Sequence, residues 1–176
     1  MRNIALFFVL AVAACATGPT YEAASNSSFI AANYSAADRL ANVLKANGQD
    51  GPLIVATFAS VDNLEQSSRL GRTLSEQIGS RLVQAGLQVI EVKLRDNVFV
   101  SNAHQGDFLL SREVRDISAN HKVNTVVVGT YSDANDYLYV TVKAVALQSG
   151  TVTASHDYAL PMLSTVRAML PPPSTR

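Results

Sequence analysis

The chain has 176 residues, of which 48% are hydrophobic, and its 14 lysine and arginine residues balance its 14 aspartate and glutamate residues. This balance argues against a nucleic-acid partner, which would require a basic patch or a clearly basic domain. The length predicts one domain with a substantial core, and the single cysteine excludes an internal disulfide.

The first 14 residues have the composition of an export signal. Residues 1–3 carry one positive charge, and residues 4–12 (IALFFVLAV) form an apolar run that is too short to span a bilayer as a helix. We therefore expect residues 1–14 to be a signal peptide that is removed. Without Arg2, 13 basic residues would face 14 acidic ones, which gives a net charge of −1.

The junction that follows, Val12, Ala13, Ala14 and Cys15, resembles the bacterial lipobox. The resemblance implies that the Cys15 thiol is diacylated and that the signal is cut just before it. Two or three acyl chains hold a protein at a membrane, whereas one binds only marginally. Ala16, rather than aspartate, follows the cysteine, which by resemblance to enterobacterial sorting rules favours the outer membrane. The alternative is an ordinary secretory signal with a bystander cysteine.

The predicted domain lies between two polar ends. Residues 15–28 form the lipidated cysteine and a flexible tether, because the segment 17–28 (TGPTYEAASNSS) is polar and lacks an apolar period. Residues 171–176 (PPPSTR) form a Pro-rich tail, which cannot be helical because prolines lack amide hydrogens. The domain is therefore expected over residues 29–170.

The first predicted elements are a helix and a strand. Ser28 is expected to cap a helix over residues 29–48 that stops at Asn47–Gly48. Its predicted inner face consists of Ile30, Tyr34, Ala37, Leu40, Val43 and Leu44. The continuous apolar run of residues 52–58 (PLIVATF) predicts a central strand that is buried on both faces.

A polar turn at Asp62 and Asn63 leads to a second predicted helix within residues 67–86, which ends at Gly86. Its inner face is predicted to consist of Leu70, Leu74, Ile78 and Leu82. Residues 87–92 (LQVIEV) alternate as a strand does. A strand, a helix and a strand joined by short turns predict a right-handed βαβ unit with parallel strands.

The last predicted elements complete a mixed sheet. Residues 107–120 are expected to form a third helix, with Phe108, Leu110, Val114 and Ile117 facing inward, followed by a strand over residues 123–130. Residues 137–147 alternate, and Ser149–Gly150 turns the chain into residues 151–160, so these two segments predict an antiparallel hairpin. With a short helix near 162–169, the fold class is α/β with a mixed sheet of about five strands.

Four blocks of sequence lie in order within residues 29–160. They are FIAANYSAADRL, PLIVATFASVDNLEQSSRLGRTLSEQIGSRLVQAGLQVIEVKLR, GDFLLSREVRDI and VVVGTYSDANDYLYVTVKAV. Together they resemble the FlgO domain of flagellar outer-membrane lipoproteins. The resemblance implies a protein that is anchored in the outer membrane, faces the periplasm and takes part in flagellar assembly, stability and motility. It supplies no catalytic residues, and it also implies a similarity to small α/β folds of other envelope lipoproteins and secretion-pore subunits.

The residues themselves do not predict an enzyme. No phosphate-binding glycine loop and no GxSxG elbow occur, and no zinc-site spacing joins the histidines. Ser101, His104 and Asp107 are close in sequence, but closeness in sequence is not triad geometry, and a solvated polar loop explains them. His121 at a helix end and His156 among strand residues also have structural explanations. We expect no catalytic residues, metal or cofactor.

Two groups of residues are candidates for surfaces that bind a partner protein. Arg69 and Arg72, with Arg81, lie on the second helix, whose unpaired N-terminal amides could receive an acidic group together with the arginines. Tyr137 and Tyr139 suit a protein interface, as does the nearby Tyr131. The structural alternatives are a solvated helix face for the arginines and packing beneath a helix for the tyrosines.

Two functions are compatible with these features. The first is a structural or assembly lipoprotein beside the flagellum, and the second is an envelope accessory lipoprotein that regulates cell-wall synthesis or serves as a secretion or transport subunit. The short tether favours action close to the membrane. A hydrolase that depends on Ser101 or His104 is the weakest reading. The expected partners are the outer membrane, through covalent lipid, and other envelope proteins, and the sequence leaves homo-oligomers open.

Overall fold

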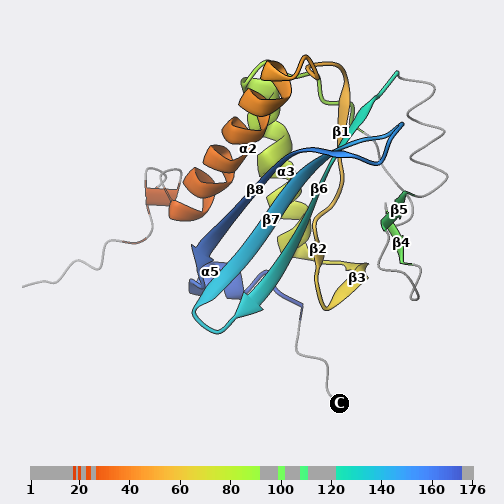
Figure 1. Ribbon diagram of the computed structural model, residues 1–176. Coiled ribbons are helices and arrows are strands. Elements are labelled where there is room, and N and C mark those ends of the chain that lie inside the picture. The colour runs from red at the N-terminus through yellow and green to blue at the C-terminus, as the bar shows by residue number, and fades with distance from the viewer. Residues whose placement is uncertain are drawn as a thin grey trace, which may run out of the picture.

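We describe the fold from a computed structural model of the chain. The structure describes residues 27–91, 99–101, 108–110 and 122–171, together with residues 18, 20, 23 and 24. Within these ranges the chain forms a six-stranded mixed sheet, a separate two-stranded sheet, and helices that pack on one face of the larger sheet (Figure 1). The predicted α/β fold with a mixed sheet is confirmed.

Helix α2 (Ser28–Ala46) lies along the sheet, and its cap is Ser27 instead of the predicted Ser28. The Ser27 hydroxyl accepts a hydrogen bond from the amide of Ile30 at 3.4 Å, as an N-cap side chain does. Ser28 itself is already helical, so its hydroxyl is one position too late for this role. The helix stops at Asn47, and Gly48 follows with φ +66°, as predicted.

The buried stripe of α2 is richer in small residues than predicted. It consists of Phe29, Asn33, Ala36, Ala37, Leu40, Ala41 and Leu44. Of the predicted inner face, Ile30 and Tyr34 are partly buried. Val43 is 41% exposed, which contradicts the prediction, because it lies at the edge of this stripe near the C-terminal end of the helix.

The predicted strand over residues 52–58 is divided into β1 (Leu53–Val55) and β2 (Ala59–Ser60). Both segments pair in parallel with β6 (Thr125–Ala134), one after the other along its length. Leu53 and Ile54 point into hydrophobic clusters on opposite faces of the sheet, as predicted for a strand buried on both faces. The strand is interrupted because Phe58 turns its ring into the core against Gly129.

After β2 the chain forms a hairpin that the sequence did not predict. Val61 and Asp62 turn the chain into β3 (Asn63–Ser67), which pairs antiparallel with β2 and lies at the end of the sheet. Asn63, predicted as part of the turn, begins this strand. Its sequence, NLEQS, lacks the alternation of apolar residues that identifies a half-buried strand.

Helix α3 (Arg69–Gln84) agrees with the prediction in both its inner face and its end. Leu70, Leu74, Ile78 and Leu82 are all fully buried. The hydroxyl of Ser68 caps the helix by accepting from the amide of Gly71 at 2.9 Å. Gly86 follows the C-cap with φ +85°, a conformation that favours glycine.

The predicted strand over residues 87–92 is reduced to one parallel bridge between Val89 and Leu53. The Leu53 amide donates to the carbonyl of Gln88 at 2.9 Å, and the Ile90 amide donates to the carbonyl of Leu53 at 2.8 Å. Both hydrogen bonds of this pairing involve the backbone of Leu53 alone. The pairing with residues 88–90 is therefore too short to count as a strand, although it is parallel as predicted. Residue 92 lies outside the described residues.

The helix predicted over residues 107–120 is wrong at its start. Residues 108–110 form strand β5 (Phe108–Leu110), which pairs antiparallel with β4 (Phe99–Ser101). Three consecutive apolar residues fit a strand as well as a helix, and here pairing with β4 provides their backbone hydrogen bonds. The other predicted inward residues of that helix, Val114 and Ile117, lie outside the described residues.

The C-terminal half of the sheet is an antiparallel meander. Strand β6 begins two residues later than predicted and continues to Ala134, and β7 (Tyr137–Ala146) and β8 (Val152–Pro161) form the predicted hairpin. Asn135, with φ 45°, and Gly150, with φ 69°, occupy the two turns. The strand order is β3-β2-β6-β7-β8, with β1 also paired to β6. The short helix α5 (Ser164–Arg167) falls inside its predicted range.

Hydrophobic clusters lie on both faces of the larger sheet. The larger cluster lies between the sheet and helices α2, α3 and α5, and we call this face of the sheet the inner face (Figure 1). A smaller cluster around Ile54, Ala56, Val123 and Val126 lies on the opposite, outer face. Side chains of β7 alternate between the two faces: Leu138, Val140, Val142 and Ala144 are buried on the inner one.

Candidate partner-binding surfaces

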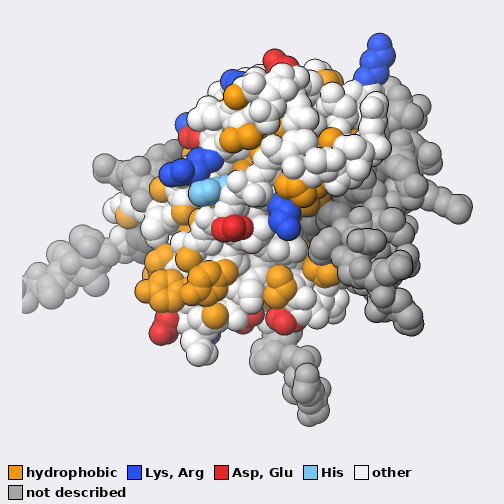
Figure 2. Space-filling model, in the orientation of Figure 1, with side chains coloured by type: hydrophobic (Ala, Val, Ile, Leu, Met, Phe, Trp, Pro, Cys, Tyr) orange, Lys and Arg blue, Asp and Glu red, His pale blue; other side chains and the backbone are white. Residues whose placement is uncertain are grey.

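Tyr137 and Tyr139 lie on the outer face of β7 and are 51% and 54% exposed. Their ring centroids are 6.5 Å apart, and the ring planes are tilted by 44°. Figure 2 shows hydrophobic side chains gathered at this end of the sheet, at the lower left of the view. The structural alternative, packing beneath a helix, is wrong for these two side chains.

Small residues flank the two tyrosines on both neighbouring strands. Across the ladder, Tyr137 pairs with Ala134 and Pro161, and Tyr139 pairs with Ser132 and Ala159. Directly paired side chains lie on the same face of a sheet, so the tyrosine rings project above their neighbours. We call Tyr137, Tyr139, Ala134, Ala159 and Pro161 the tyrosine patch.

Tyr131 differs from this pair because it lies on the inner face. Its side chain is 1% exposed, and its hydroxyl shares a 2.6 Å hydrogen bond with the hydroxyl of Ser68. Burial raises the pKa of Tyr131, and the hydrogen bond to Ser68 partly opposes this rise. Tyr131 therefore links β6 to the start of α3 and is not available to a partner.

Arg69 and Arg72 are exposed at the start of α3, where three backbone amides are already hydrogen-bonded. The amide of Leu70 donates to the carbonyl of Met169, that of Gly71 to the Ser68 hydroxyl, and that of Arg72 to the Ser68 carbonyl. Three of the amides that the sequence offered for an acidic group therefore already have acceptors within the fold. The Arg72 guanidinium donates to the Ser67 hydroxyl at 2.7 Å, so it is also partly engaged.

The two predicted surfaces do not form one site. Arg69 and Arg72 belong to a helix on the inner face of the sheet, whereas Tyr137 and Tyr139 project from the outer face. The sheet itself separates the arginines from the tyrosines. A single partner protein would have to extend around the edge of the sheet to contact both.

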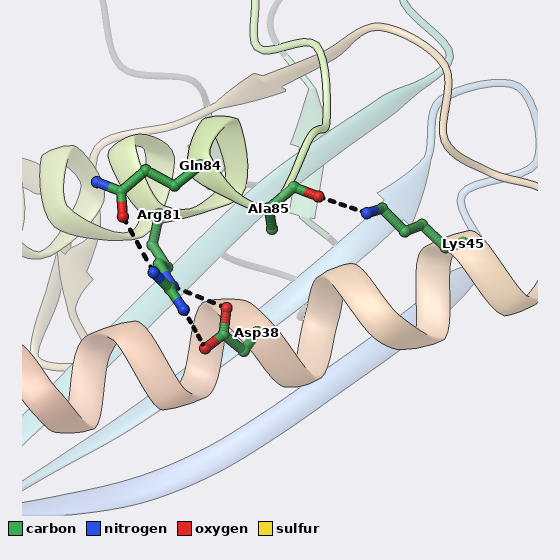
Figure 3. Close-up of polar contacts among 5 residues, drawn as sticks. All are labelled: Asp38, Lys45, Arg81, Gln84 and Ala85. Atoms are coloured by element: carbon green, nitrogen blue, oxygen red, sulfur yellow. Dashed lines mark hydrogen bonds and ion pairs between the residues drawn. The ribbon is translucent and has the colours of Figure 1, made fainter.

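A row of polar contacts, which sequence reasoning missed, joins α2 to α3 (Figure 3). The Arg81 guanidinium donates to both carboxylate oxygens of Asp38, at 2.8 and 3.0 Å, and to the Gln84 side chain at 3.1 Å. The hydrogen bond with Asp38 raises the pKa of Arg81. The Lys45 ammonium donates to the carbonyl of Ala85 at the end of α3. Arg81, which the sequence placed with Arg69 and Arg72, therefore holds the two helices together.

A partly buried chain of polar side chains connects the sheet to both helices. The Tyr158 hydroxyl donates to Asn33 at 2.5 Å, and the Asn33 amide donates to Gln77 at 2.6 Å. Asn33 is fully buried, and burial strongly raises the pKa of Tyr158. His156 stacks on Tyr158 with ring centroids 6.1 Å apart, so this histidine packs within the fold as its structural explanation predicted.

Two of the three residues of the catalytic alternative fall outside the part of the chain that the structure describes. Ser101 lies in β4, and its proposed partners His104 and Asp107 lie outside the described residues, as does His121. Within the described ranges, no group of three or more His, Cys, Asp or Glu side chains could hold a metal ion.

The predicted anchor also lies outside the described residues. Cys15 and the lipobox residues Val12, Ala13 and Ala14 all belong to this part of the chain. Of the helices in the described part, none has both the length and the apolar character needed to cross a bilayer.

Comparison with known proteins gives one family and several solved structures with similar folds. The sequence model of the family described as FlgO protein matches residues 34–165. No match was found among curated proteins.

The solved structures are distant in sequence. The LpoB C-terminal domain from Salmonella enterica is 15% identical, with a TM-score of 0.49 over 73% of this chain and 97% of that one. Lipoprotein GNA1162 from Neisseria meningitidis is 11% identical, with a TM-score of 0.41 over 65% and 83%. A PelC dodecamer from Paraburkholderia phytofirmans is 12% identical, with a TM-score of 0.37 over 63% and 71%.

Proposed function

Because this chain belongs to the FlgO protein family, we propose that it is a non-catalytic lipoprotein of the outer membrane that supports flagellar assembly, stability or motility. Its α/β domain would face the periplasm. The observation that carries this proposal is the extent of the family match, which runs from within α2 to α5 and so includes both candidate surfaces.

The contacts of the domain support a binding role rather than a catalytic one. Its polar clusters connect secondary-structure elements: Asp38 with Arg81 and Asn33 with Gln77 join the helices, and Ser68 with Tyr131 joins α3 to the sheet. By contrast, the tyrosine patch is exposed, and aromatic residues with a polar tip are frequent in protein interfaces.

The position of the domain relative to the membrane follows from the proposed anchor at Cys15. Helix α2 is capped at Ser27, so a tether of roughly a dozen residues would separate the lipid from the folded domain. Such a tether spans about four nanometres at most when extended. The domain would therefore act close to the inner surface of the outer membrane.

The test is swimming motility, with electron microscopy of flagella, in a strain that lacks the gene and is complemented with different forms of it. The intact chain and the control Ala16→Ser, which keeps the cysteine, should restore flagella and swimming. Cys15→Ser should not restore them, and it should also lose incorporation of labelled palmitate. The control separates loss of the lipid from a general effect of changing the junction.

Each result has a distinct meaning. Normal flagella and swimming in the deletion strain would contradict the flagellar role. Full restoration by Cys15→Ser would contradict the need for a lipid anchor while leaving the flagellar role in place.

A further inference from the structure

We propose that the tyrosine patch, together with the carboxylates of Asp136 and Asp157, is a docking surface for a partner-protein segment that carries arginine or lysine side chains. This inference rests on the proposed function as an accessory protein that acts by binding, and it names the surface and the chemistry of the partner.

The first argument is the accessibility of the two rings. Tyr137 and Tyr139 are both about half exposed, although they lie in the middle strand of the β6-β7-β8 meander. Alanine, serine and proline are their cross-strand neighbours, so a partner can reach the faces as well as the edges of the rings. Burying two such rings is a usual source of affinity at the centre of a protein interface.

The second argument is the charge around the rings. Asp136 immediately precedes Tyr137 in the β6–β7 turn, and Asp157 pairs with Thr141, which makes it a diagonal neighbour of Tyr139. Both carboxylates are exposed, and Figure 2 shows acidic side chains above and below the hydrophobic group. Lys143 is the next outer-face residue of β7 after Thr141, so Asp157 lies between Lys143 and the tyrosine patch.

Aromatic rings between carboxylates attract a cation in two ways. An arginine or lysine side chain placed over a tyrosine ring is attracted by the negative face of the ring, and its charge is complemented by the nearby carboxylates. This combination favours a basic protein segment with apolar neighbours that cover the alanine and proline side chains.

The same charges argue against a second copy of this chain as the occupant. In a two-fold symmetric contact the same patch meets itself, so Asp136 and Asp157 of both copies would gather in one interface. Like charges brought together in this way cost free energy. Lys143 is a diagonal neighbour of Asp157, and the Arg167 guanidinium donates to the carbonyl of Asn135, but among the described residues neither cation forms an ion pair with Asp136 or Asp157.

The experiment is photo-cross-linking in the native cells with the full chain carrying p-benzoylphenylalanine. The cross-linker replaces Tyr139 in one strain and, as a matched control, Val83, which is 53% exposed on α3. Cross-linked peptides are identified by mass spectrometry. Each strain is then repeated with Asp136→Asn and Asp157→Asn together, and thermal unfolding of the purified variants confirms that they are folded.

The expected result is a product at position 139 in which the linked partner segment contains arginine or lysine within a few residues. The paired asparagine changes should reduce its yield about fivefold, which corresponds to roughly 1 kcal/mol of attraction, and should leave any product at position 83 unchanged. The proposal would be overturned if position 139 gave no product, or if its product were on this chain itself or on a segment without basic residues. It would also be overturned if the asparagine changes left the yield unchanged.

These outcomes are independent of the motility test. If deletion of the gene abolishes swimming but position 139 gives no such product, the docking surface is wrong and the flagellar role stands. If deletion leaves swimming intact while the charge-dependent product forms, the docking surface stands and the flagellar role is wrong.

Discussion

Two glycines on α3 face neighbours at very different distances. A Cβ added at Gly71 would lie 1.9 Å from the carbonyl oxygen of Phe58, which belongs to the backbone between β1 and β2. A Cβ at Gly79 would meet the Val55 side chain at 3.6 Å, an ordinary contact. The structure thus distinguishes a position that requires glycine from one that tolerates alanine.

We therefore predict opposite effects for the two alanine substitutions. Gly71→Ala should lower the free energy of unfolding by about 2 kcal/mol or more, because the backbone of Phe58 must move. Gly79→Ala should raise it by about 0.5 to 1 kcal/mol, because alanine is the better helix former. Urea denaturation measures both, and a stable Gly71→Ala variant would contradict the close approach.

His156 gives the fold a dependence on pH. Burial lowers its pKa below the ordinary value of 6.5, the positive charge of Arg39 lowers it further, and Asp157 partly opposes both. The folded state then binds a proton on His156 less readily than the unfolded state does. The free energy of unfolding should therefore fall as the pH drops below 6.5.

His156→Gln should make the unfolding midpoint less dependent on pH between about pH 7 and pH 5. Arg39→Gln should have the same effect in weaker form, since it removes only one of the causes of the lowered His156 pKa. Thermal unfolding of the unchanged chain and of the two variants at a series of pH values measures this. Identical pH profiles for all three would show that His156 does not contribute.

At the scale of elements, strong periodic patterns were predictable and weak ones were not. The buried stripe of α3 and the β7–β8 hairpin follow directly from leucine spacing and from strict alternation. Strand β3 was missed because its polar sequence carries no period, and residues 108–110 were assigned to a helix because three apolar residues fit both periods. Pairing with β2 and with β4 decides these cases, and a single sequence does not show it.

The polar contacts between α2 and α3 differ in burial, so their loss should differ in cost. Asn33→Ala removes a fully buried amide and leaves the Tyr158 hydroxyl without its acceptor and the Gln77 side-chain oxygen without its donor, which should cost about 2 kcal/mol of unfolding free energy. Asp38→Asn should cost much less, because the ion pair with Arg81 is more than one third exposed on each side. Urea denaturation compares the two, and a larger loss for Asp38→Asn would contradict this ranking.

At the scale of the whole molecule, helix α2 and its cap begin before residue 29, the predicted start of the domain. Ser27 caps α2 from outside the predicted range, and Phe29 is buried in the main core. A fragment of residues 27–171 should unfold in one cooperative transition. A fragment that begins at residue 29 should be less stable by about 1 kcal/mol or more, because it lacks the cap. Equal stability of the two fragments would show that the cap contributes little.

The candidate surfaces were only partly predictable. Tyr137 and Tyr139 were identified because alternation along a strand predicts which side chains share a face. The sequence did not show that Tyr131 faces the core or that Arg81 is paired with Asp38, because both depend on contacts between distant parts of the chain. The lipobox at Cys15 is a local pattern, and its role stays a prediction.

The order of strands in the sheet also has a consequence for how the chain folds. The β6-β7-β8 meander joins strands that are neighbours in sequence, whereas β1 and β2 must pair with β6 across a long stretch of intervening chain. Closing the longer loop costs more chain entropy before any contact forms, so the meander should form first and serve as the template for β1 and β2. Destabilising substitutions in β7 should then slow folding, and those in β1 should mainly speed unfolding.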